Sequence, residues 1–189
     1  LQNGVYEDSN WKKKIDESGC SMATSAMVLS NLKHQEITPN QLNPLYTSDD
    51  ANDGGRFADE VFGTYQLDYS MTKGFSSKDN AGNLILDNVL ENGGAVIRSV
   101  TLYPESTNDQ SQIDWNGHYV ALLDVNTFGD KKMYYFADPN EQTPGKWITE
   151  DSLEYQWMAE SHGTTIMIAP DGMTIEEAFK PSNYESQNI

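Results

Sequence analysis

The spacing of apolar residues changes from a helical to an extended pattern at Gly93-Gly94, and this change restricts the folds that the chain can adopt. Before the two glycines, apolar and small residues recur every three or four positions in the ranges 20–32, 57–65 and 80–90, as they do in helices. After them, apolar residues run in short stretches rich in β-branched and aromatic side chains, which favour strands. Helices followed by strands predict an α+β fold in which a helical half packs on an antiparallel sheet half.

Local patterns define several of these elements more closely. In the range 20–32 the apolar and small residues cover most of the helix circumference, which predicts a helix buried on more than one side. Thr38, Pro39 and Gln41 form a capping-box pattern, so a second, short helix should begin there.

The second half of the chain contains four predicted strands, with the sequences AVIRSVTLY, HYVALLDV, KMYYFADP and TTIMIAP. Gly129-Asp130 lies between the second and third of them and suits a tight connection, which predicts that these two strands form a hairpin. The stretch TEDSLEYQWMA, before the last strand, has a helical pattern that starts at Thr149.

Length and composition favour one folded module. We assign residues 1–172 to a single domain and residues 173–189 to a short helical turn with a polar C-terminal tail or linker. Apolar residues make up 37% of the chain, too many for a disordered protein, and no apolar run reaches the roughly 18–20 residues of a membrane span. The formal net charge of -17 repels nucleic-acid phosphates and anionic lipids, so neither nucleic acid nor membrane is expected as a partner.

The sequence has no pattern that indicates a metal or cofactor. One cysteine and three dispersed histidines do not provide the closely spaced ligands of a zinc site. The acidic stretch TSDDANDGG is out of register with calcium-binding loops and lacks their closing glutamate, which favours an ordinary solvated loop.

Cys20, the single cysteine, is the first candidate for chemistry. It follows Gly19 at the start of the predicted helix 20–32. The free N–H groups and the dipole at a helix N-terminus stabilise a thiolate, which would make Cys20 a nucleophile. The alternative is a buried apolar thiol, because unpaired cysteine is among the most buried residue types.

His118 and Asp138 are the candidates for the groups that would activate such a thiol. His118 opens one strand of the predicted hairpin and Asp138 follows the other, so antiparallel pairing should bring the two side chains together. Taken singly, His118 also fits a structural histidine at a strand end, and Asp138 fits an Asp-Pro turn. His34 and His162 have no evident polar partner in the sequence.

The chain resembles the papain-like cysteine peptidases, and among them the bacterial C39-like group, in the order and spacing of five segments. These are GCSMATSAMVLSNL, ITPNQL, NGGAVIRSV, GHYVALLDV and YYFADPN. The resemblance extends over about residues 5–170. It implies a papain-like fold with the nucleophile on a central helix. It also implies that Cys20 is the nucleophile, His118 the general base and acid, and Asp138 the residue that orients His118, with Asn140 as the alternative for that third role.

One part of the family pattern is altered. The family uses a glutamine upstream of the cysteine as an oxyanion-hole donor, and alignment on Trp11 places Tyr6 at that position. Gln2 would reach it only after a register shift. Trp115 and Gly117, just before His118, are candidates for a cleft wall, although Trp115 fits core packing equally well.

These features lead to two expectations for function. The first is a cysteine peptidase-type hydrolase that cleaves peptide or amide bonds, or transfers the acyl group to an amine, with an altered oxyanion hole. The second is a catalytically weak or inactive papain-like module that binds or scaffolds a peptide or protein. Because the chain starts at Leu1 without a signal peptide, we expect either a removed export signal or a module cut from a longer protein. The family resemblance, together with the acidic and polar surface, implies a secreted bacterial protein.

Overall fold

The computed structural model describes residues 19–46, 57–73, 80–100, 118–141, 145–152, 154–155 and 164–182, and gives only the backbone for residues 73 and 80–83. The helices are α2 (Cys20–Lys33), α3 (Pro39–Leu42), the 3-10 turn η1 (Asn43–Leu45), α4 (Phe57–Thr64), α5 (Asn80–Glu91) and α7 (Ile175–Ala178). The strands are β1 (Tyr69–Lys73), β2 (Ala95–Val100), β3 (His118–Phe128), β4 (Lys131–Ala137), β5 (Lys146–Thr149) and β6 (Thr164–Ile168).

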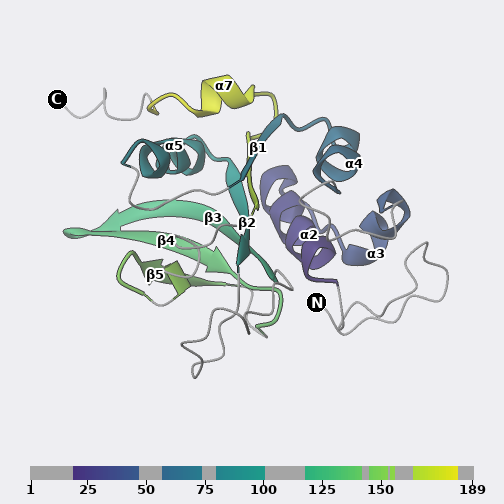
Figure 1. The fold of residues 1–189 in the computed structure, drawn as a ribbon, viewed down its shortest axis with the longest axis horizontal. Coiled ribbons are helices and arrows are strands. Elements are labelled where there is room, and N and C mark those ends of the chain that lie inside the picture. The colour runs from purple at the N-terminus through teal and green to yellow at the C-terminus, as the bar shows by residue number, and fades with distance from the viewer. Residues whose placement is uncertain are drawn as a thin grey trace.

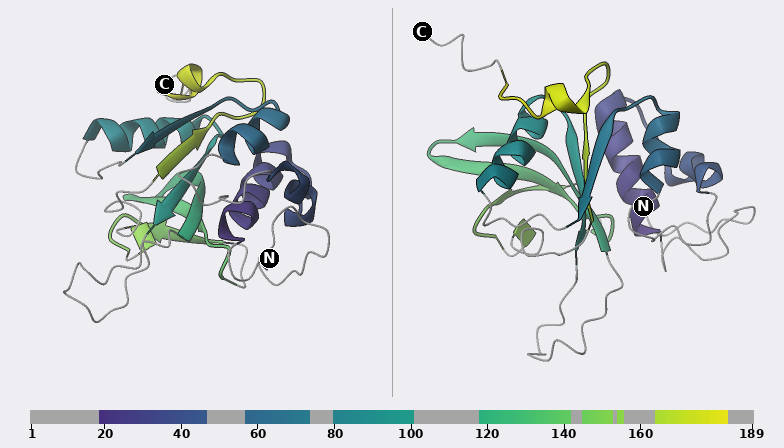
Figure 2. Two further views of the ribbon diagram at one scale, coloured as in Figure 1. Left: turned by 45° about the vertical axis from the view of Figure 1, so that its right-hand side comes forward. Right: turned by 45° about the horizontal axis from the view of Figure 1, so that its top comes forward.

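The described strands form one antiparallel sheet in the order β1-β6-β2-β3-β4-β5. Helices α2, α3 and α4 lie on one side of it, and α5 and α7 lie on the other (Figures 1 and 2). The predicted α+β architecture is thus confirmed, and so are the helix that starts at Cys20 and the β3-β4 hairpin.

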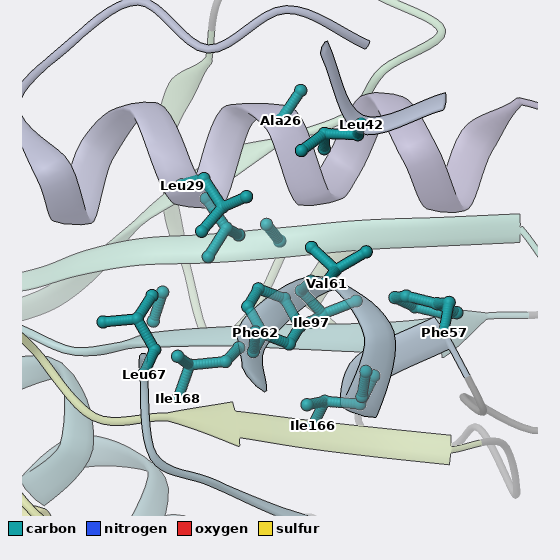
Figure 3. Packing of buried hydrophobic residues seen from close by; sticks show 14 of the residues in the cluster. Ala26, Leu29, Leu42, Phe57, Val61, Phe62, Leu67, Ile97, Ile166 and Ile168 are labelled. Atoms are coloured by element: carbon teal, nitrogen blue, oxygen red, sulfur yellow. The ribbon is translucent and has the colours of Figure 1, made fainter. Parts of the chain in front are cut away.

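Both faces of the sheet centre are buried because neighbouring strand residues point to opposite sides. On β2, Ile97 belongs to the apolar cluster under α2 and α4, whereas Val96 belongs to the cluster under α5. Figure 3 shows the first cluster, whose side chains, among them Leu29, Phe62 and Ile166, fill the space between α2, α4 and the sheet. Small residues make up half of α2 and allow this helix to lie close to the sheet. The helix is buried on more than one side, as predicted.

The capping box at α3 is also confirmed. The backbone N–H of Thr38 donates to the Gln41 side chain at 2.7 Å, and Pro39 is the first helical residue. A second capping box, between Thr174 and Glu177, starts α7. Residues Ile175 and Ala178 of this short helix are buried in the cluster beneath α5, and Asn88 on α5 donates to the Phe179 carbonyl at 2.8 Å. No helix in the described ranges is both long and apolar enough to cross a membrane.

The predicted helical start at Thr149 is wrong. Thr149 is the last residue of β5, a strand that pairs with β4 through Tyr134↔Ile148 and Tyr135↔Trp147. The pairing buries Ile148 and satisfies backbone groups on the outer side of β4, which outweighs the local helical pattern. Within the remainder of that stretch, Glu154 and Tyr155 are helical, and residues 153 and 156–159 lie outside the described residues.

Candidate active site

Cys20 is the first residue of α2, and its side chain is half-buried. Gly19 precedes it as the N-cap residue, and the first turn of the helix contains no acidic side chain. The first backbone N–H groups of a helix have no partner within the helix and carry the positive end of its dipole. A thiolate on Cys20 is therefore stabilised by the helix N-terminus. No carboxylate in the first turn of α2 repels it.

His118 and Asp138 meet at the open end of the β3-β4 hairpin. Continued beyond Ala121↔Ala137, the register places Asp138 across from Val120, so Asp138 and His118 are diagonal neighbours on the same face of the hairpin. Nε2 of His118 lies 2.7 Å from Oδ1 of Asp138, and the exposed fractions of the two side chains are 6% and 12%. At such low exposure the ion pair is shielded from solvent and its geometry is fixed by packing.

This pairing changes the protonation of His118. Burial alone lowers the pKa of an imidazole and is the largest influence, but hydrogen bonds to Asp138 and Cys20 and the negative charge of both partners outweigh it and raise the pKa of His118 to about 9. Burial raises the pKa of Asp138, but the hydrogen bond from His118 and the backbone N–H of Asn140 lower it more. Both shifts favour the imidazolium form of His118 and the carboxylate form of Asp138.

The hydrogen bonds of His118 also join the thiol to the pair. Because Nε2 faces Asp138, the other ring nitrogen, Nδ1, is the one left to face Cys20. Cys20, His118 and Asp138 thus form a continuous series from a helix N-terminus to the hairpin.

Asn140, the alternative orienting residue, contacts both members of the pair. Its backbone N–H donates to Oδ1 of Asp138 at 2.8 Å, and its side-chain Nδ2 lies 3.4 Å from Nε2 of His118. The carboxylate of Asp138 is the nearer group to the imidazole, and an ionised acceptor forms the stronger hydrogen bond with an imidazolium. In this arrangement Asn140 holds Asp138 in place.

Thr24 fixes α2 against the hairpin. Its Oγ1 donates to the Tyr119 carbonyl at 2.9 Å, a buried hydrogen bond between residues 95 apart in the sequence. Thr24 lies one helical turn after Cys20, and Tyr119 follows His118 directly, so this bond sets the position of the thiol relative to the imidazole. The sequence analysis did not identify Thr24, although its spacing of four from Cys20 places both on one helix face.

Aromatic packing supports the same region. The Tyr46 hydroxyl lies 3.4 Å from the Ser25 hydroxyl of α2, and the Tyr46 ring stacks on Phe57 at 5.8 Å. The Phe57 ring in turn meets the Tyr119 ring edge to face at 5.3 Å. Three elements of the helical half are thereby connected to the strand that carries His118.

The other histidines and the remaining predicted site residues are either far from Cys20 or outside the described residues. His34 is the C-cap residue of α2, a helix of 14 residues whose ends are therefore about 20 Å apart. Five further residues lie outside the described ranges. They are the oxyanion-hole candidates Tyr6 and Gln2, the cleft-wall candidates Trp115 and Gly117, and His162.

Comparison with known proteins identifies the fold. No protein-family profile and no curated protein matches the sequence. Among solved structures, the peptidase domain of Streptococcus ComA, a bifunctional ABC transporter involved in a quorum-sensing pathway, is similar over 82% of this chain and 94% of its own, with a TM-score of 0.52 and 13% identity. A Bacillus anthracis protein described as a C39-like peptidase is similar over 83% of this chain and 91% of its own, with a TM-score of 0.52 and 14% identity. This chain therefore has the α+β, papain-like fold of C39 peptidase domains.

Proposed function

We propose that this chain is a thiol hydrolase of peptide or amide bonds in which Cys20 is the nucleophile, His118 the general acid and base, and Asp138 the residue that orients His118. The observation that carries the proposal is the buried contact of 2.7 Å between Nε2 of His118 and Oδ1 of Asp138, on an imidazole that also interacts with a thiol at a helix N-terminus. The fold of C39 peptidase domains supports it further.

Each residue would have a defined role in the reaction. The Cys20 sulfur attacks the carbonyl carbon, the S–C bond forms, and negative charge develops on the carbonyl oxygen next to the α2 N-terminus. The His118 imidazolium gives its proton to the leaving nitrogen, the C–N bond breaks, and a thioester remains. Neutral His118 then takes a proton from water, hydroxide attacks the thioester, and the acid leaves as the Cys20 thiolate is restored.

Asp138 would act through His118. Its carboxylate accepts the hydrogen bond from Nε2 in both halves of the reaction, which keeps Nδ1 directed at the thiol and favours the protonated ring. The net charge of -17 favours neutral or basic substrates over acidic ones, because like charges repel near the cleft.

Alkylation of Cys20 combined with a peptide library tests the proposal. At pH 7, iodoacetamide should modify Cys20 in the folded protein at least tenfold faster than in the same protein in urea, since a paired thiolate reacts faster than an ordinary thiol. Mass spectrometry reports a single adduct because the chain has one cysteine. The folded protein should also cleave members of a peptide library, and the alkylated protein should not.

The outcomes separate the two candidate functions. Slow alkylation of folded protein would contradict the activated nucleophile. Rapid alkylation without cleavage of any peptide or amide would contradict the hydrolase and favour a papain-like binding module. If cleavage products carry a transferred amine when an amine acceptor is added, the reaction is acyl transfer by the same residues.

The pH profile should report the charge of Asp138. Because the leaving nitrogen needs the proton of His118, kcat/KM for peptide hydrolysis should fall above about pH 9. Asp138→Asn keeps a hydrogen-bond acceptor but removes the charge that raises the pKa of His118, so the alkaline limb should move to lower pH. The measurement is kcat/KM between pH 5 and 10.

Asp151→Asn is the matched control for this profile, because Asp151 is an exposed carboxylate on the turn after β5. Its alkaline limb should coincide with that of the original protein. If the alkaline fall of kcat/KM occurred at the same pH in Asp138→Asn as in the original protein, His118 would not be the acid that limits the rate.

A further inference from the structure

A cavity lies at the end of α2 opposite to Cys20. It has a volume of about 700 Å³, within the range of small-ligand and side-chain pockets, and it is lined by the C-terminal part of α2, by β3, β4 and β5, and by residues around Pro170. The 14 residues of α2 separate it from Cys20 by about 20 Å. The cavity is thus not a part of the candidate active site.

One wall of this cavity is a row of three side chains across neighbouring strands. Asp124 on β3 pairs with Tyr135 on β4, and Tyr135 pairs with Trp147 on β5. Directly paired residues of adjacent strands point to the same face, so the carboxylate and the two aromatic rings lie side by side. All three line the cavity.

An irregularity in β3 contributes to this wall. The register shifts between Leu122 and Asp124, so that Leu123 is an extra residue in the strand. Leu122 belongs to the cluster under α5, whereas Leu123 packs against the cluster under α2, and both Leu123 and Asp124 line the cavity. A bulge of this kind turns a side chain toward a new direction, and here it brings Asp124 to the face that carries Tyr135.

The two aromatic rings are held at a steep angle. The planes of Tyr135 and Trp147 are inclined by 63° with centroids 5.4 Å apart, and Phe128 packs against Trp147 at 5.1 Å. A Cβ atom on Gly145 would lie 2.8 Å from the Tyr135 ring, so only glycine at this position avoids a clash with the ring. The rings thus form a corner of two walls, similar in shape to the aromatic cages that bind organic cations.

The charges around the corner favour a positive ligand. Lys33 is the only lysine or arginine among the described lining residues, and its Nζ is paired with Asp171 at 2.9 Å. Oδ1 of Asp124 accepts the Val125 N–H at 2.8 Å, which orients this exposed carboxylate beside Tyr135. The lining therefore has a formal charge of -1 from Asp124 in addition to the neutralised pair, in a chain of net charge -17.

We infer that this cavity binds a guanidinium or alkylammonium group, with the cation against Tyr135 and Trp147 and its charge balanced by Asp124. Such groups occur on arginine and lysine side chains of a polypeptide and on small amines. The ring faces attract the cation, and the carboxylate supplies a charge-assisted hydrogen bond. The inference does not depend on hydrolysis at Cys20.

The test is an NMR titration of the complete chain in which the tryptophan indole N–H signals are observed. Trp147→Phe assigns the Trp147 signal by its loss. Nα-acetyl-arginine methylamide should shift this signal, whereas the citrulline analogue, which is neutral and has the same shape, should not. Asp124→Asn should weaken the arginine ligand about tenfold, the effect expected from one ion pair in a partly shielded site.

Glu176→Gln is the control for charge. It changes the net charge equally but lies exposed on α7, outside the cavity lining, so binding should be unchanged. An equal response to arginine and citrulline, an unchanged affinity in Asp124→Asn, or no shift of the Trp147 signal would overturn the inference.

A second arm distinguishes the source of the cation. A peptide of eight residues with one central arginine should bind at least tenfold tighter than the single amino acid derivative if the cavity recognises a polypeptide, because neighbouring residues add contacts. Equal affinities would assign the cavity to small cationic molecules. Both results support the cation site and differ only in the source of the ligand.

Discussion

The Cys20→Ser variant is expected to lose peptide hydrolysis on the order of 10⁴- to 10⁶-fold in kcat/KM, the loss typical when a nucleophile is removed. Serine has nearly the same shape as cysteine, but its hydroxyl must be deprotonated by a neutral base at the moment of attack. In this variant the hydrogen bond and charge of Asp138 still raise the pKa of His118, which favours the protonated ring over the neutral base that a hydroxyl needs. The arrangement suits a thiolate and not a hydroxyl.

The measurement is kcat/KM at pH 7 on the best peptide found with the library, with circular dichroism to verify folding. Met27→Leu is the control in the same helix, because Met27 is partly exposed and the exchange conserves volume. It should keep activity within about twofold. If Cys20→Ser retained a tenth of the activity or more, the nucleophile would be another group and the proposed mechanism would be wrong.

The features predicted correctly from the sequence depend on interactions between near neighbours. The capping box at Thr38 and the helix from Cys20 are determined within a few residues. The encounter of His118 and Asp138 follows from a hairpin whose tight turn at Gly129-Asp130 sets the pairing of its strands. A pair of polar residues at the open end of one hairpin is therefore within reach of sequence reasoning.

The relation of Cys20 to His118 could not be obtained in that way. It depends on α2 packing against β3, which is held by the hydrogen bond between Thr24 and the Tyr119 carbonyl, far apart in the sequence. Local spacing contains no information on such a contact. The expectation came from resemblance to a family, and the structure provides the physical link between helix and strand.

The short edge strands were missed for a related reason. Strands β1 and β5 have 5 and 4 residues, too few to establish an alternating pattern, and β5 is followed by polar residues that also suit a helix start. Their conformation is determined by pairing with β6 and β4. The extra residue Leu123 in β3 is likewise invisible in the sequence, because HYVALLDV fits a regular strand equally well.

Gly94→Ala is expected to destabilise the fold by about 3 kcal/mol or more, a large part of the roughly 5–15 kcal/mol that stabilises a domain. Gly94 connects α5 to β2, and a Cβ atom there would lie 2.4 Å from the Ile168 carbonyl oxygen and 2.9 Å from the Val89 carbonyl oxygen. Both are backbone atoms, one in β6 and the other in α5. Neither can move aside without breaking the β2-β6 pairing or the helix end that receives the Gly94 N–H at 2.8 Å.

Urea denaturation followed by circular dichroism measures this loss, and Gly63→Ala is its matched control. Gly63 is exposed on α4, and a Cβ atom there would meet no atom within 4 Å. Alanine loses less backbone entropy than glycine on folding into a helix, so this variant should gain about 0.5–1 kcal/mol. Two identical substitutions should thus change the free energy of unfolding in opposite directions. Equal changes in the free energy of unfolding would mean that the backbone around Gly94 relaxes freely. The close approach of α5, β2 and β6 would then not require glycine at position 94.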